Sequence, residues 1–202
     1  MSSGLRERKK AETRTALQDT ALRLADRLGV DRVSVEAIAE EVGVSPRTFF
    51  NYFTSKEDAI LGISPTEPTP LLDHLRSRPV DEAPLESMRQ ALLASTERLQ
   101  EDPDRWVIRR RLVQRHPELA AKYAARLADM EQDMVEVIAG RLGLDPDRHT
   151  YPGTVVSASM AATRVAMSIW QTHDDPTELV HLIDEVFATL ATGLPAPPPP
   201  AG

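Results

Sequence analysis

Residues 34–56 read SVEAIAEEVGVSPRTFFNYFTSK, a pattern that predicts two short helices joined by a tight turn. Ser34 is a favoured N-cap residue for the first helix. The apolar residues of this helix recur at helical spacing and are Val35, Ile38, Ala39 and Val42. Gly43 comes next, where a backbone that leaves a helix with positive φ favours glycine. The first helix is therefore expected to stop at the glycine.

The second helix of this stretch is predicted to begin after Ser45, another N-cap residue. Pro46 occupies its first turn, where a missing N–H group is tolerated. Phe49 and Phe53 lie one turn apart and supply the apolar face, and Ala39 is small enough for two helices to cross there. This arrangement is a helix-turn-helix, whose second helix lies in the major groove of DNA.

An ordinary pair of antiparallel helices is the commoner interpretation of such a pattern. Against it, the second helix projects four side chains able to bond phosphates or base edges, namely Arg47, Thr48, Asn51 and Tyr52. Lys56 adds a positive charge at the start of the next predicted helix. A basic run also lies upstream and includes Arg8, Lys9 and Lys10. We therefore interpret the stretch as a DNA-binding element.

Residues 11–62, AETRTALQDTALRLADRLGVDRVSVEAIAEEVGVSPRTFFNYFTSKEDAILG, resemble the DNA-binding domain of TetR/AcrR-type transcriptional regulators. The phrase VSPRTFFNYFTSKEDAIL is the most specific part of the resemblance. The resemblance implies an all-α protein of about nine helices that binds a palindromic operator as a homodimer and responds to a small molecule, most often as a repressor. An activator, or a regulator without a small-molecule effector, is the alternative.

The resemblance also implies roles for individual residues of this sequence. The positions expected at the DNA are Ser45, Pro46, Arg47, Thr48, Phe50, Asn51, Tyr52, Lys56, Arg8, Lys9 and Lys10. Arg47 and Asn51 are expected at base edges, whereas Thr48, Tyr52 and Lys56 are expected at phosphates.

Two of these positions depart from the family pattern. Phe50 stands where the family usually has tyrosine, so it can touch a thymine methyl group but cannot donate a hydrogen bond. Arg47 replaces a frequent glycine and could bind guanine through two hydrogen bonds or bind a phosphate.

Composition and charge set wider limits. The chain has 202 residues and no cysteine, which excludes disulfides, thiol redox switches and thiolate metal sites. The start, MSSGLRERKK, has no apolar stretch after its charges, so no signal peptide is predicted and a cytoplasmic location is expected. The net charge is −7, yet residues 1–60 hold ten Lys and Arg against ten Asp and Glu. Residues 61–202 therefore carry the whole acidic excess, which would be repelled by DNA.

The domain organisation can be drawn from these patterns. Residues 1–9 are expected to be a disordered basic arm that on DNA enters the minor groove or neutralises phosphates. The DNA-binding domain is expected at 10–62. Closely spaced prolines then predict an irregular connection at 63–83, with a short helix at 70–76. A helical ligand-binding and dimerisation domain is expected at 84–194, followed by a disordered proline-rich tail.

Residues 153–172 are nearly uncharged, but Arg164 is central and several Ser and Thr residues are scattered through them. We interpret this segment as a buried helix rather than a membrane span. With the last helix it is expected to form half of a four-helix dimer interface; the alternative is that both helices only close the core of one chain. The interface candidates are Val155, Ala158, Ala162, Val165, Ile169, Leu179, Ile183, Val186 and Phe187.

The ligand site is expected among the helices of the second domain. Its candidates are Met88, Leu92, Trp106, Arg109, Arg110, Val113, Tyr123, Leu127, Met130, Met134, Met160 and Met167, although each methionine can equally be plain core. At least one arginine of the run 109–111 is expected to point inward, toward a ligand anion or toward Glu118, Asp129, Glu131 or Asp133. Residues 109–146 also resemble the regulatory domain of actinobacterial mycofactocin-system regulators, which implies acyl-CoA-like ligands.

The sequence gives little support to two other classes of protein. The five histidines have no paired-ligand spacing, and the GxSxG, GxGxxG and P-loop motifs are absent from the sequence. We therefore expect no metal, no cofactor and no enzyme activity. A helix-rich enzyme, or an adaptor that binds only protein, is the remaining alternative.

Overall fold

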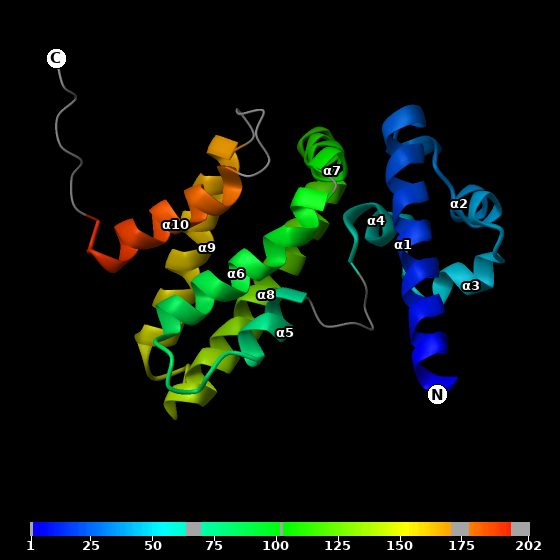
Figure 1. Ribbon diagram of the computed structural model, residues 1–202. Coiled ribbons are helices and arrows are strands. Elements are labelled where there is room, and N and C mark those ends of the chain that lie inside the picture. The colour runs from blue at the N-terminus through cyan, green and yellow to red at the C-terminus, as the bar shows by residue number, and fades with distance from the viewer. Residues whose placement is uncertain (1, 64–69, 102, 171–177, 195–202) are drawn as a thin grey trace, which may run out of the picture. The chain divides into compact units, whose positions relative to one another are not determined.

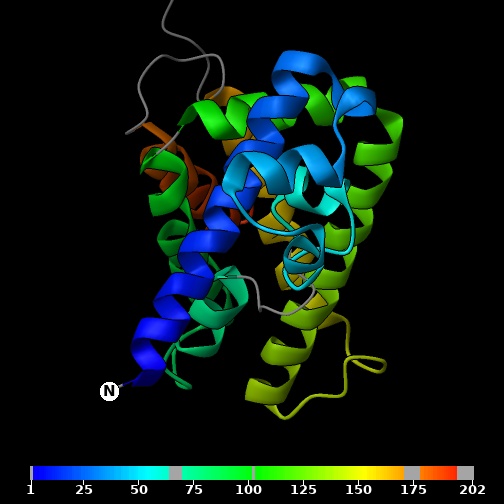
Figure 2. The same cartoon turned by 90° about the vertical axis from the view of Figure 1, so that its right-hand side faces the viewer.

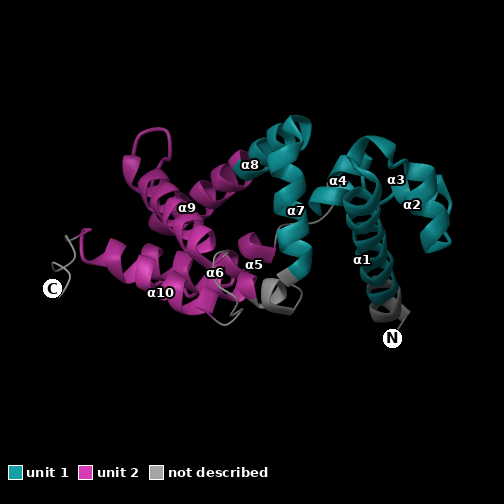
Figure 3. Ribbon diagram, turned by 90° about the horizontal axis from the view of Figure 1, so that it is seen from above, with its two compact units in different colours: residues 1–68, 104–127 teal, residues 69–103, 128–202 magenta. Residues whose placement is uncertain are grey.

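The computed structural model describes residues 2–63, 70–101, 103–170 and 178–194, with the side chains of 2–7, 97–101 and 103 left aside. Within these ranges the protein is all-α, as expected, with ten α-helices, one short 3-10 helix and no strand (Figure 1). The chain divides into two compact units (Figure 3). Unit 1 comprises residues 1–68 and 104–127, and unit 2 comprises residues 69–103 and 128–202.

Unit 1 is built from the N-terminal helices and a part of the second half of the chain. Its elements are α1 (Ser2–Leu28), η1 (Val30–Arg32), α2 (Val35–Val42), α3 (Pro46–Phe50), α4 (Lys56–Leu61), α7 (Pro103–Arg115) and the start of α8 (Pro117–Leu142). Figures 1 and 2 both show α1 running alongside α2, α3 and α4.

The N-terminal arm differs from the expectation, because α1 already begins at Ser2. Residues 2–9 are therefore helical, where the sequence predicted disorder. Residues 5–9 are Leu, Arg, Glu, Arg and Lys, which are all good helix formers. Arg8 Nε also lies 3.4 Å from Glu12 Oε1, one turn further along.

The core of unit 1 combines both of its chain segments. Side chains from α1–α4 are buried together with Leu112 of α7 and Leu119 of α8. The largest fully buried members are Leu17, Ile38, Phe49, Phe53, Ile60 and Leu119. The DNA-binding part predicted at 10–62 thus shares its core with helices that the sequence assigned to the regulatory part.

Unit 2 contains the remaining helices, which are α5 (Pro70–Arg76), α6 (Pro84–Glu101), the rest of α8, α9 (Thr150–Trp170) and α10 (Glu178–Ala191). The short helix predicted at 70–76 is confirmed. Helices α9 and α10 lie side by side, and α6 packs against both. The predicted tail at 195–202 lies outside the described residues. None of the described helices combines the length and the hydropathy that a transmembrane span requires.

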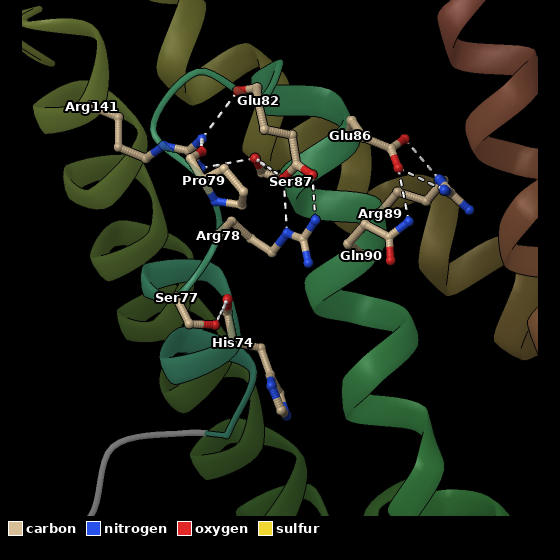
Figure 4. Close-up of polar contacts among 10 residues, drawn as sticks. All are labelled: His74, Ser77, Arg78, Pro79, Glu82, Glu86, Ser87, Arg89, Gln90 and Arg141. Carbon is tan, nitrogen blue, oxygen red and sulfur yellow. Dashed lines mark hydrogen bonds and ion pairs between the residues drawn. The ribbon is translucent and has the colours of Figure 1, made fainter.

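The connection between α5 and α6 is fixed by a polar network (Figure 4). Arg141 of α8 donates hydrogen bonds to the carbonyls of Pro79 and Glu82 and, at 2.8 Å, to Ser87 Oγ. Arg78 Nε donates to Glu82 Oε2 at 2.9 Å, and Ser87 Oγ donates to the same oxygen at 2.7 Å. The hydrogen bond from Arg78, followed by that from Ser87, lowers the pKa of Glu82 to about 2.

Glu82→Gln is expected to lower the thermal midpoint at pH 7 by about 2–4 °C, the effect of a loss near 1 kcal/mol in a chain of this size. Because the folded pKa of Glu82 lies below the unfolded value, its carboxylate stabilises the fold above about pH 4.5. That stabilisation is lost as the pH falls toward 2. The difference between variant and wild type should therefore shrink across this window in thermal melts. Asp129→Asn, at an exposed position of α8, is the control; a pH-independent difference would contradict the account.

Candidate nucleic-acid interface

The first helix of the helix-turn-helix has the predicted caps. Ser34 Oγ accepts a hydrogen bond from the Ala37 N–H at 3.1 Å at the start of α2. Gly43 ends the helix with φ 76°, in the left-handed region that favours glycine. The Val44 N–H then donates to the Ala39 carbonyl at 2.9 Å and fixes the turn.

Helix α3 is short, and two aromatic rings, one within it and one just after it, hold it against the core. Ser45 Oγ accepts from the Thr48 N–H at 3.1 Å and caps the helix. Phe49 and Phe53 are fully buried, and their ring centroids lie 5.6 Å apart. Ala39 of α2 is fully buried in the same core. Because both rings point into the core, the opposite face of α3 must face outward.

That outward face carries most of the residues predicted to contact DNA. Ser45, Pro46, Arg47, Phe50 and Asn51 are all exposed. The Phe50 side chain keeps 56% of its surface accessible, which is unusual for a large apolar residue. Its ring meets Phe49 edge-on, with centroids 5.5 Å apart, so it is held rather than loose.

The other predicted DNA contacts lie beside this face or on α1. Thr48 and Tyr52 are half-buried, and the Thr48 hydroxyl shares a 2.9 Å hydrogen bond with Ser45 Oγ. Arg8, Lys9 and Lys10 are exposed on the N-terminal part of α1.

Lys56 makes contacts within the protein that the sequence did not predict. Its Nζ donates hydrogen bonds to the Val30 carbonyl at 2.9 Å and to the Val33 carbonyl at 2.8 Å. Two of the three donors of the ammonium group are therefore used to hold the turn around η1. The sequence shows the charge of this residue but not the carbonyls that the fold brings to it.

Helix α4 is held at both ends by helices from the second chain segment of unit 1. At its start, Lys122 Nζ lies 2.8 Å from Asp58 Oδ1 and 2.6 Å from Ser55 Oγ. At its end, Arg109 Nε donates to the Ile60 carbonyl at 3.1 Å. We call these contacts of Lys122 and Arg109 the α4 clasp.

The arginines of α7 do not pair with the acidic residues of α8 that the sequence suggested as partners. Arg105 lies 2.5 Å from Asp19, and Arg111 pairs with Asp26, so both reach α1. Arg110 lies over the Trp106 ring, 5.9 Å from its centroid. Glu118, Asp129, Glu131 and Asp133 take none of these roles. No periodicity in the sequence indicates that α7 and α1 share a unit.

The predicted ligand-binding residues are divided between the two units. Those in unit 1 are Trp106, Arg109, Arg110, Val113, Tyr123 and Leu127, and those in unit 2 are Met88, Leu92, Met130, Met134, Met160 and Met167. Met88 and Met134 are fully buried, as expected of plain core residues. Val113 and Tyr123 pack against the core of unit 1.

Ser159 of α9 is a residue that the sequence did not single out. It is fully buried, and its hydroxyl has no hydrogen-bond partner among the described residues. A serine in an apolar helix gives no signal in the sequence that its hydroxyl will be left without a partner.

The predicted dimer interface needs a correction. Four of its candidates are buried within unit 2 of a single chain, namely Val155, Leu179, Ile183 and Phe187. They cannot offer apolar surface to a second chain, because the main stripe of α10 packs against α9 and α6 instead. Val165 and Ile169 keep 53% and 40% of their surface exposed. Ala158, Ala162 and Val186 are half-buried.

Residues 17–61, which run from the second half of α1 to the end of α4, match the family described as bacterial regulatory proteins, tetR family. Residues 82–195 match the family described as the MftR C-terminal domain, which is itself a class of TetR C-terminal domains.

Individual relatives agree with these matches. The chain is 36% identical to the HTH-type transcriptional regulator TcmR of Streptomyces glaucescens over 178 residues, 85% of this chain and 79% of the relative. It is 28% identical to the HTH-type transcriptional repressor KstR of Rhodococcus jostii, over 79% of this chain and 69% of the relative. The fold is shared with SmeT of Stenotrophomonas maltophilia in complex with triclosan, at a TM-score of 0.56 and 20% identity over 93% of this chain and 99% of SmeT. With a tetR-family match on its helix-turn-helix and relatives along most of its length, the chain belongs to the TetR family and is a DNA-binding transcriptional regulator.

Proposed function

We propose that the protein is a repressor that binds a palindromic operator as a homodimer and is released by a small apolar or acyl-type effector. The observation that carries the proposal is the outward face of α3. Arg47, Phe50 and Asn51 are exposed there, opposite the fully buried Phe49 and Phe53. A rigid platform that presents a guanidinium, an aromatic ring and an amide matches the edges of bases in the major groove.

Each of these side chains has a chemical partner in DNA. Arg47 can donate two hydrogen bonds to guanine, and Asn51 can exchange two with adenine. Phe50 is suited to the methyl group of thymine, which would also cover its exposed ring.

Phosphate contacts come from the flanks of this face. Thr48 and Tyr52 lie beside the exposed residues of α3. The exposed cations Arg8, Lys9 and Lys10 are carried by a helix, so we assign them to phosphates rather than to entry into the minor groove as an extended arm. Lys56 keeps one free donor and acts chiefly on the turn that precedes α2.

Dimerisation is assigned to the part of α9 that its own chain leaves exposed. Val165 and Ile169 lie one turn apart and are joined along α9 by the half-buried Ala158 and Ala162. Val186 of α10 is also half-buried. Small and apolar side chains allow two such helices to approach closely, and a twofold axis places two α3 helices on half-sites about 34–36 Å apart.

Repression and its release follow if effector binding and operator binding are thermodynamically linked. KstR is a repressor, and SmeT, a repressor of the same fold, has been solved with triclosan. An effector that weakens operator binding 100-fold must bind the DNA-incompatible conformation about 2.7 kcal/mol more tightly. The α4 clasp supports such coupling, since it joins α7 and α8 directly to the helix that follows the DNA reader.

Arg47→Ala is expected to weaken binding to a selected operator duplex by about 1–3 kcal/mol and to relax the preference at one base pair. The reason is the loss of a bidentate contact to guanine. Fluorescence anisotropy on the operator and on duplexes substituted at single positions measures both effects. Arg115→Ala, which removes an exposed arginine from α7, should leave affinity unchanged. An equal loss on every duplex would assign Arg47 to a phosphate instead.

A further inference from the structure

Phe50 is an apolar ring that the fold leaves uncovered on the outward face of α3. Its side chain is 56% exposed, although an aromatic ring is among the side chains that gain most from burial. The preceding residue, Phe49, is fully buried in the core of unit 1. The core therefore takes one of two consecutive phenylalanines, and more than half of the surface of the other stays in water.

The direction of the exposed ring is restricted. Phe50 is the last residue of α3, and its ring meets the Phe49 ring edge-on, with centroids 5.5 Å apart and the two planes at 87°. Phe49 is fixed in turn, because it is buried and lies against Phe53. A side chain that is already held in place loses little conformational entropy when it binds, so more of its contact energy contributes to affinity.

Arg47 precedes Phe50 by one turn on the same outward face. Both residues are exposed, and the Arg47 guanidinium has no ion pair or hydrogen bond with any described residue. Three residues of an α-helix span about 4.5 Å along its axis, which is close to the spacing of about 3.4 Å between base pairs. With Arg47 on a guanine, Phe50 therefore meets the neighbouring base pair.

The chemistry of the ring determines what it can recognise on that base pair. The apolar feature that a base pair presents in the major groove is the C5-methyl group of thymine. Phenylalanine has no hydrogen-bonding group, so it cannot distinguish the O4 acceptor of thymine from the N4 donor of cytosine. 5-Methylcytosine carries a methyl group on the same ring carbon as thymine. The ring is thus suited to the methyl group itself, on either pyrimidine.

We propose that Phe50 recognises a pyrimidine C5-methyl group in the base pair next to the guanine bound by Arg47, and that 5-methylcytosine can replace thymine there. Uracil and unmodified cytosine lack the methyl group and are disfavoured. Methylation of a cytosine beside the guanine then converts a poor half-site into a good one, so that DNA methylation becomes an input to operator binding. The inference rests on the proposed function and adds the chemical class of base that α3 selects.

Substituted operator duplexes test the proposal by fluorescence anisotropy on the full-length protein. Starting from a selected operator, each thymine is replaced by uracil, which removes only the methyl group. One thymine per half-site is expected to respond, with affinity about threefold to fourfold lower for one replacement and about tenfold lower for both half-sites. At the same position, 5-methylcytosine should bind about threefold or more tightly than cytosine. The responsive base pair should adjoin the one at which Arg47→Ala relaxes the preference.

Two variants and a control assign the effect to Phe50. Phe50→Ala should bind the thymine and uracil duplexes equally, and likewise the cytosine and 5-methylcytosine duplexes. Phe50→Tyr keeps the ring and should restore the preference for the methyl group. Val107→Ala removes another half-exposed apolar side chain of unit 1, on α7, and should keep the wild-type ratios. Because each readout is a ratio of two affinities, a general loss of stability does not imitate it.

The proposal is overturned if no thymine responds to the loss of its methyl group, or if 5-methylcytosine binds no better than cytosine. It is also overturned if Phe50→Ala keeps the wild-type ratios, or if the responsive thymine lies elsewhere than beside the base pair read by Arg47. Failure of this inference is distinguishable from failure of the proposed function. A protein that binds its operator but ignores the methyl groups refutes only the inference, whereas one that binds no duplex refutes the proposed function.

Discussion

Phe53→Ala is expected to lower the free energy of unfolding by about 3–5 kcal/mol. Phe53 is fully buried, with its ring against Phe49 in the core that α1, α2 and α3 share. Truncation removes the transfer energy of the ring and leaves a cavity that the short helix α3 cannot close. Urea denaturation followed by circular dichroism measures the loss. Operator binding should fall with it, since α3 loses one of its two anchors.

Phe50→Ala is the matched control, at a position three residues earlier along the chain. Its side chain is 56% exposed, so the free energy of unfolding should change by less than about 0.5 kcal/mol. Operator affinity should still fall, because the contact to a thymine methyl group is lost. A large loss of stability from Phe50→Ala, or none from Phe53→Ala, would show that the two rings are assigned to the wrong faces.

Lys122→Met is expected to cost about 2–3 kcal/mol of stability, somewhat less than for a fully buried ion pair, because Lys122 is partly exposed. Methionine keeps the aliphatic stem but leaves the Asp58 carboxylate, only 4% exposed, without its cation. The start of α4 should loosen, which would reduce operator affinity as well as stability. Chemical denaturation and anisotropy on the operator measure the two effects.

A double-mutant cycle identifies the cause of that loss. In an Asp58→Asn background, Lys122→Met should cost less than about 1 kcal/mol, because no buried charge is left uncompensated. The same cost in both backgrounds would mean that the ion pair does not hold α4.

The DNA-binding part of the chain was predictable because its signals are local. Ser34, Gly43 and Ser45 act on backbone groups within four residues, and they cap the helices where expected. The spacing of Phe49 and Phe53 defines the inner face of α3, and the outer face follows from it. The helix at 70–76 was likewise predictable from the prolines that flank it.

The contacts that the sequence did not predict join segments that are distant along the chain. The partners of Arg105, Arg109 and Arg111 lie on α1 and α4, between 49 and 86 residues away along the chain. Periodicity shows that α10 has an apolar stripe but not which helix will cover it, so Leu179 and Ile183 were assigned to the wrong partner. The carbonyls that Lys56 binds could not be predicted for the same reason, because the fold brings them to it.

Operator recognition by a homodimer can be tested by selecting bound sequences from a pool of random duplexes and measuring the stoichiometry and salt dependence of the best complex. We expect an inverted repeat bound by two chains, with affinity that falls as salt is raised because phosphate contacts release counterions. Enrichment of no sequence at low salt, by protein shown by mass spectrometry to carry no bound small molecule, would contradict it.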